Sequence, residues 1–162
     1  MHRATESMSE LFIAALTNAD SFDDVKKGVI GVLNEVSNGG RLGYVSGILT
    51  SDTQELVELN KRRLAGYTDY LRGDAAFPVF SATDIFSNEL EDTLSGSTIT
   101  EWHSFWRDVL EQGHVTDIFM TPRWRSSAGA NDEHETAKRI GISIHYMDDS
   151  PELKSIMNRH MK

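Results

Sequence analysis

The feature that most constrains this fold is a change of hydrophobic spacing near residue 42. From there on, short apolar segments at 42–49, 76–80, 115–120 and 141–147 alternate with stretches of helical periodicity at about 53–73, 99–110 and 130–140. Strands that alternate with helices imply right-handed crossovers and a parallel sheet covered on both faces. The sequence therefore predicts an α/β fold, flavodoxin-like or Rossmann-like: a three-layer sandwich with a mainly parallel sheet of four to five strands.

The first 41 residues differ from this pattern and predict an N-terminal helical segment, with helices at about 8–17 and 22–36. We expect two parts, a helical extension over 1–41 that packs on the main domain and an α/β domain over 42–162. The valine stripe from Val25 to Val36 either packs on the protein's own sheet or forms a dimer surface. Residues 81–98 predict a long loop with one helical turn at most, and Ser150-Pro151 predicts the start of a closing helix.

Charge and composition exclude several classes of partner. The chain has 162 residues, a formal net charge of -9, 39% hydrophobic residues and no cysteine. Nucleic-acid polymers and anionic membranes would be repelled at long range, although local donors can still bind a small anion. The absence of cysteine excludes disulfides and thiol catalysis. The histidines lack the paired spacing of a zinc helix, so we expect no metal and no cofactor. The longest early apolar run is too short to span a membrane and lacks a basic flank, so we expect a cytoplasmic protein.

Glu133 is a charged residue on a helix face where apolar residues are expected. Ala130, Ala137 and Ile140 fall on one stripe of a helix, and Glu133 lies between them on the same face. A glutamate in the first turn of a helix usually complements the helix dipole, but an inward-facing one is also a candidate for chemistry.

Two small-residue loops follow predicted strands, where parallel sheets bind ligands. Ser46 and Gly47 end the first strand, and this segment is either a ligand loop or a plain turn. The stretch 126–129, with Ser127 and Gly129, begins the Glu133 helix. Its free amides, with nearby arginines, suit an anion, and capping of the helix by serine is the alternative. The arginines are Arg123 and Arg125.

The residues from Trp124 to Ala137 resemble the signature of the nucleoside 2-deoxyribosyltransferase-like superfamily. They are most similar to a branch of small bacterial and phage proteins with a Trp-x-x-Ser-x-Gly-Ala-x-x-x-Glu pattern. The similarity covers about residues 42–147. It includes, further upstream, the following positions: Tyr44, Ser46, Gly47, Asn60, Arg107, Asp108 and Asp117.

The resemblance implies roles for individual residues. Glu133 would be the nucleophile at C1′ of the sugar, Ser127 would bind a 5′-phosphate, and Asp108 would position or protonate the base. Members with nucleotide specificity carry an arginine directly after the first glycine, where this chain has Ile48, so Arg123 and Arg125 are the alternative phosphate ligands. The other residues expected to bind substrate are Ser46, Gly47, Asn60, Asp117, Trp124 and Gly129. Trp124 could stack on a base or hold its loop onto the core.

The implied activity is cleavage or transfer of an N-glycosidic bond in a nucleoside or nucleotide. Two alternatives are cleavage of the nicotinamide bond of NAD, and a nucleotide-binding module without turnover. Because members of this superfamily often complete their sites with neighbouring subunits, the resemblance also implies a homo-oligomer.

Overall fold

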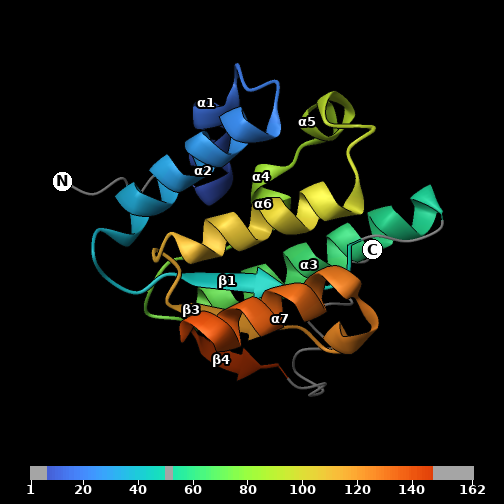
Figure 1. Cartoon of the computed structure of the whole chain (residues 1–162). Coiled ribbons are helices and arrows are strands. Elements are labelled where there is room, and N and C mark those ends of the chain that lie inside the picture. Colours follow the sequence, from blue (N-terminus) through green and yellow to red (C-terminus); the bar gives the residue numbers. More distant parts are fainter. Residues whose placement is uncertain (1–6, 50–52, 148–162) are drawn as a thin grey trace.

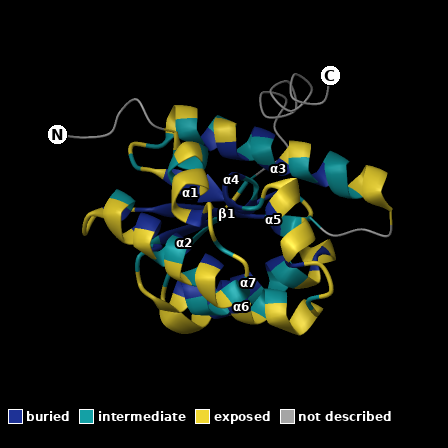
Figure 2. Cartoon of the chain, turned by 90° about the horizontal axis from the view of Figure 1, so that it is seen from above, coloured by how far each residue is buried: buried dark blue, intermediate teal, exposed yellow. Residues whose placement is uncertain are grey.

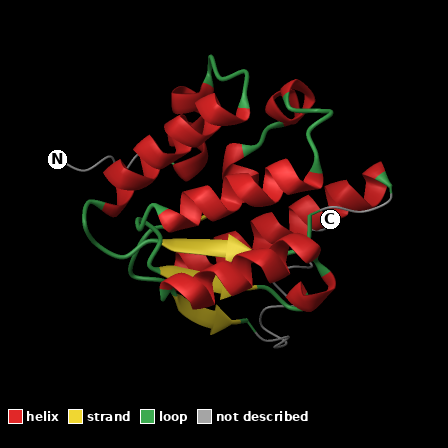
Figure 3. Ribbon diagram, viewed as in Figure 1, coloured by secondary structure: helices red, strands yellow, loops and turns green. Residues whose placement is uncertain are grey.

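Four short parallel strands form the centre of the protein in this computed structural model, which describes residues 7–49 and 53–147 (Figure 1, Figure 3). The strands lie in the order β2-β1-β3-β4, and their bounds are β1 Gly43–Ser46, β2 Val79–Ser81, β3 Asp117–Met120 and β4 Ser143–Tyr146. Every neighbouring pair is parallel. After β1 the chain forms β2 on one side of β1, and it then crosses to form β3 on the other side of β1. The winding therefore reverses between β1 and β3, and the carboxyl ends of these two strands are where such sheets bind ligands.

Helices cover both faces of this sheet, which confirms the predicted α/β sandwich. Helix α3 (Gln54–Asp74) lies behind the sheet in Figure 1, and α6 (Ile99–Glu111) and α7 (Ala128–Ile140) lie side by side in front of it. Successive strand residues point to opposite faces. Val45 accordingly packs with Leu64 of α3, whereas Tyr44 and Ser46 point toward α7. In the part of the chain that is described, no helix is long and apolar enough to cross a membrane.

The N-terminal helices α1 (Met8–Leu16) and α2 (Phe22–Ser37) belong to the same hydrophobic core as the sheet. Helix α2 contacts α6, and α1 contacts α4 (Ala82–Ile85). Figure 2 shows the buried residues of these helices on their inner side and exposed residues outside. The valine stripe is covered within the chain itself, since Val25 and Val29 are fully buried.

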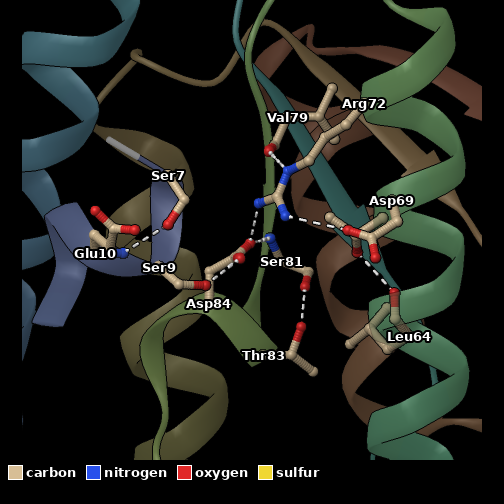
Figure 4. Close-up of polar contacts among 11 residues, drawn as sticks. Ser7, Ser9, Glu10, Leu64, Asp69, Arg72, Val79, Ser81, Thr83 and Asp84 are labelled. Atoms are coloured by element: carbon tan, nitrogen blue, oxygen red, sulfur yellow. Dashed lines mark hydrogen bonds and ion pairs between the residues drawn. The ribbon is translucent and has the colours of Figure 1, made fainter. Parts of the chain in front are cut away.

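A buried carboxylate joins the first helix to the main fold (Figure 4). Asp84 accepts hydrogen bonds from the Arg72 guanidinium at 2.6 Å, from the Ser81 amide at 2.9 Å and from the Ser9 hydroxyl at 2.9 Å. Arg72 also donates to the Val79 carbonyl at 3.0 Å. One side chain thus connects α1, α3 and the end of β2.

Some details differ from the expectations. Residues 81–98 contain two short helices, α4 and α5 (Asn88–Thr93), where we expected one turn at most. Leu56, Ile99 and Ile140 fall on the apolar stripes of the helices predicted at 53–73, 99–110 and 130–140, but they are 46%, 68% and 37% exposed. Each lies near a helix end. A helix of 13 to 21 residues is longer than a four-residue strand of roughly 13 Å, so the helix ends extend beyond the sheet and their side chains are exposed. The closing helix expected at Ser150 lies outside the described residues.

Candidate active site

Glu133 is buried against the carboxyl end of β1, in agreement with its inward position in the sequence pattern. Its side chain is 7% exposed. Its Oε1 atom accepts two hydrogen bonds, from the Tyr44 hydroxyl at 2.8 Å and from the Ser46 hydroxyl at 2.8 Å. Tyr44 and Ser46 reach the same carboxylate because residues two apart on a strand share a face. Two strand residues therefore fix one oxygen of a glutamate on α7.

The surroundings of Glu133 favour a proton near neutral pH. The pKa of Glu133 is raised overall from 4.5 to about 7. Burial is the largest cause, because a charge is costly away from water; the bonds from Tyr44 and Ser46 lower the pKa, and the nearby Asp132 raises it. The pKa of Tyr44 is raised well above its usual value by burial and by the adjacent Glu133. Tyr44 is thus a neutral hydrogen-bond donor, and Glu133 can exist in both forms under physiological conditions.

The second carboxylate oxygen, Oε2, accepts no hydrogen bond from a described residue. Both hydrogen bonds to Glu133 from described residues go to Oε1. Gly129 lies one turn earlier on α7, and a Cβ atom at this glycine would lie 4.0 Å from Oε2, 3.9 Å from the Ser127 Oγ and 3.8 Å from the His103 Nε2. Three polar atoms, from α6, from α7 and from the N-cap of α7, therefore lie within about 4 Å of the Cβ position of Gly129, which is empty because the residue is glycine. We call the space at this Cβ position the Gly129 opening.

Ser127 and Gly47 each have a clear local function. The Ser127 hydroxyl caps α7 by accepting from the Ala130 amide at 3.2 Å, as the capping alternative predicts, and its own proton is still available to a ligand. Gly47 packs tightly against Thr121, because a Cβ atom there would clash with the threonine side chain. A glycine at this position lets the loops after β1 and β3 approach each other.

Two predicted site residues lie elsewhere. Asp108 faces α2 and forms an ion pair with Lys26 at 3.1 Å. Asp117 begins β3, at the amino end of the sheet, and is bound there by Arg41 and His145, each at 2.8 Å. Burial opposes the charge on Asp117, but hydrogen bonds from Arg41, Thr116 and His145 outweigh it and lower its pKa to about 2. The structure does not bring either aspartate to Glu133.

Trp124 holds its loop in place, which is the second of its two expected roles. It is 7% exposed, and its ring stacks on His134 with 4.3 Å between centroids. The Arg125 guanidinium covers the indole at 4.6 Å. Trp124 and Arg125 are therefore engaged with each other and with α7.

Two hollows lie beside the site, and neither includes Glu133 in its lining. The first, of about 190 Å³, contains Asn60 and Arg123 together with Arg63 and Tyr67. The second, of about 470 Å³, lies between Arg123, Trp124 and Tyr146. Thr121 lines both hollows, and its amide bonds to the carbonyl of Ser46 at 3.0 Å. Both hollows thus adjoin the end of β1, where Ser46 donates to the Glu133 carboxylate. Asn60 also fixes the loop after β1, since its amide donates to the Leu49 carbonyl at 3.3 Å.

Sequence reasoning missed two members of the site, Tyr44 and His103. Tyr44 shares a strand face with Ser46, and this two-residue spacing was readable. His103 shares a flank of α6 with Arg107 and Glu111 at four-residue intervals, but the sequence does not say which helix this flank meets. Within 7–49 and 53–147, no three histidine, aspartate or glutamate side chains are grouped so that they could hold a metal ion.

Comparisons with protein-family models, with curated proteins and with solved structures give no match to this chain. The resemblance to the deoxyribosyltransferase-like superfamily therefore rests on the residues quoted for it. The fold and the geometry around Glu133 carry the functional argument.

Proposed function

We propose that the protein cleaves or transfers the N-glycosidic bond of a nucleoside or nucleotide, with Glu133 as the nucleophile at C1′. The observation that carries this proposal is the asymmetry of the Glu133 carboxylate. Tyr44 and Ser46 fix Oε1, whereas Oε2 faces the Gly129 opening. A carboxylate held in this way suits attack on an electrophilic carbon.

The chemistry needs few groups. Oε2 forms a bond to C1′ while the bond from C1′ to the base breaks, and the bonding electrons leave with the base nitrogen. The positive charge that develops on the sugar is stabilised by the carboxylate, whose interaction is strong because the site is buried. Water then releases the sugar from Glu133 in a hydrolase, and a second base releases it in a transferase.

The neighbouring arginines support a substrate that carries phosphate. Arg63 and Arg123 line the same hollow next to Thr121, and neither has an ion-pair partner among the described residues. Guanidinium groups bind phosphate oxygens in a bidentate manner. Arg123 thus retains the phosphate role inferred from the sequence, and Arg63 joins it. Arg125 lines the second hollow while it packs on Trp124.

The proposal is tested by the release of free base. The wild type and Glu133→Gln are incubated with nucleosides, nucleoside monophosphates and NAD, and the products are separated by chromatography. We expect release by the wild type and a loss of at least about a thousandfold in the variant, as for removal of a catalytic nucleophile. Glu135→Gln, which removes an exposed carboxylate two residues away, is the matched control.

The base that appears identifies the substrate class, and nicotinamide alone would favour the NAD alternative. If no compound releases a base, the enzymatic proposal is wrong. A nucleotide that then raises the melting temperature would indicate the binding module, because a ligand that binds only the folded state stabilises it.

A further inference from the structure

Three polar residues lie along the flank of α6 that meets α7, and two of them form ion pairs with α7. Glu111 pairs with Arg139 at 3.3 Å, and Arg107 pairs with Asp132 at 2.8 Å. One turn further toward the start of α6, His103 occupies the same flank. No hydrogen bond or ion pair joins the His103 side chain to a residue of the described part of the chain. In place of a third charged partner, α7 presents Gly129 there.

The position of His103 follows from the direction of the two helices. Both run antiparallel to the strands, so both begin at the carboxyl end of the sheet, where β1 delivers Ser46 to Glu133. The Arg107 to Asp132 pair fixes the register between them with two further contacts, at 3.0 and 3.2 Å. His103 Nε2 and the nucleophilic oxygen Oε2 therefore both lie at the Gly129 opening, 3.8 and 4.0 Å from its Cβ position.

We propose that His103 is the proton donor to the base that leaves C1′, an inference that rests on the proposed function. As Oε2 bonds to C1′, the electron pair of the glycosidic bond passes to the base nitrogen, and that nitrogen takes the proton of Nε2. The neutral imidazole then accepts a proton from the water or the second base that attacks C1′ in the next step. Each cycle thus returns both His103 and Glu133 to their starting forms.

Histidine suits this task because its side chain exchanges protons near neutral pH. Asp108, to which the resemblance gave this role, faces α2 and Lys26. It lies five residues after His103, so the helix turns it away from α7. Within α6, His103 is the acid that the geometry places at the Gly129 opening.

The test compares substrates that need a proton donor with substrates that do not. A guanine nucleoside or nucleotide must have its leaving base protonated, whereas the N7-methylated form carries a positive charge and leaves as a neutral base. Rates are measured for the wild type, His103→Gln and His103→Asn, with His114→Gln as a histidine control. Circular dichroism and thermal melting verify that each variant is folded.

We expect the His103 variants to lose about a hundredfold to ten-thousandfold in kcat on the unmethylated substrate. On the methylated substrate they should stay close to wild type. Equal losses on both substrates would assign His103 a packing role, and unchanged rates on both would give it no role, so either result overturns the inference. Wild-type cleavage of the methylated substrate alone would overturn it too. If the wild type cleaves neither substrate nor any other compound, the proposed function has failed and the inference fails with it.

Discussion

At the residue scale, the site depends on a compromise at Glu133 between stability and chemistry. Its carboxylate is held by two hydroxyl groups, yet it is buried enough that ionisation opposes folding. In the proposed reaction Glu133 must be ionised to attack, so we expect activity and stability to respond to pH in opposite directions around neutrality.

This opposition predicts the stability of Glu133→Gln. The pKa of Glu133 is raised to about 7 in the folded protein from 4.5, so its stabilising contribution is complete below pH 4.5 and is lost as the pH rises to 7. The neutral variant avoids this loss. Its free energy of unfolding should match wild type near pH 4 and exceed it by about 3 kcal/mol above pH 7. Urea unfolding at several pH values measures the difference.

Glu135→Gln controls for the removal of one negative charge from a chain whose net charge is -9. Unfolding curves of Glu133→Gln and wild type that differ equally at every pH would show that the Glu133 carboxyl does not titrate in the way its burial implies.

The Gly129 opening predicts an unusual glycine variant. Gly129→Ala places a methyl group at ordinary contact distance from His103, Ser127 and Glu133, so it fits the fold. Alanine is favoured over glycine in a helix, so stability should be unchanged or higher by up to about 1 kcal/mol. The methyl group occupies the space assigned to the sugar and base, so cleavage should fall by more than about a hundredfold. Steady-state rates and thermal melting measure both quantities.

Gly31→Ala is the matched control, because a Cβ atom at Gly31 of α2 would meet nothing within 4 Å. It should gain stability and keep full activity. An active Gly129→Ala protein would exclude the Gly129 opening as the reaction space.

At the element scale, the structure shows how far a single sequence can be interpreted. The strands were predictable because their apolar runs are short and bounded by small residues, and Glu133 was predictable because helical spacing places it between Ala130 and Ala137. The site was predictable only in part, because its other half depends on the contact between α6 and α7. Periodicity gives the angle between His103 and Asp108 on α6, but it does not give the flank that faces α7. Asp117 was expected at the site only from the resemblance; it begins β3, at the end of the sheet opposite to the one where parallel sheets bind ligands.

Because Asp84 connects α1, α3 and β2, we predict that its removal lowers the free energy of unfolding substantially. Asp84→Ala removes the acceptor for Arg72, the Ser81 amide and the Ser9 hydroxyl (Figure 4). Removing one partner of a buried pair leaves unpaired polar groups. Because Arg72 is 31% exposed and can partly rehydrate, we expect a cost of about 2 to 4 kcal/mol in urea unfolding. Asp23→Ala, at a carboxylate that is 81% exposed and 3.8 Å from Lys26, should cost less than about 1 kcal/mol. Equal costs would contradict the role of Asp84.

At the scale of the whole molecule, the N-terminal helices and the sheet share one core. Phe12 of α1 packs on Phe80 of β2 with 5.9 Å between ring centroids, and Phe22 of α2 packs edge-on against Trp102 of α6 at 4.8 Å. The second of these contacts joins α2 to α6, and Trp106 of α6 in turn stacks on Tyr44 of β1 with 4.8 Å between ring centroids. The register of α6, and with it the position of His103, therefore depends on residues that precede the α/β part of the chain.

Deletion of residues 1–41 tests this dependence. The shortened chain would expose the aromatic side chains of α6 and the face of Phe80, and exposed apolar surface of this kind favours a loosely packed or aggregated state. We expect the deletion variant to lose its near-ultraviolet circular dichroism and its cooperative urea transition, whereas the full chain unfolds in a single transition. Deletion of residues 1–6 alone, which precede α1, is the control and should preserve both signals. A shortened chain that unfolds cooperatively and still cleaves substrate would show that the α/β part folds and positions α6 by itself.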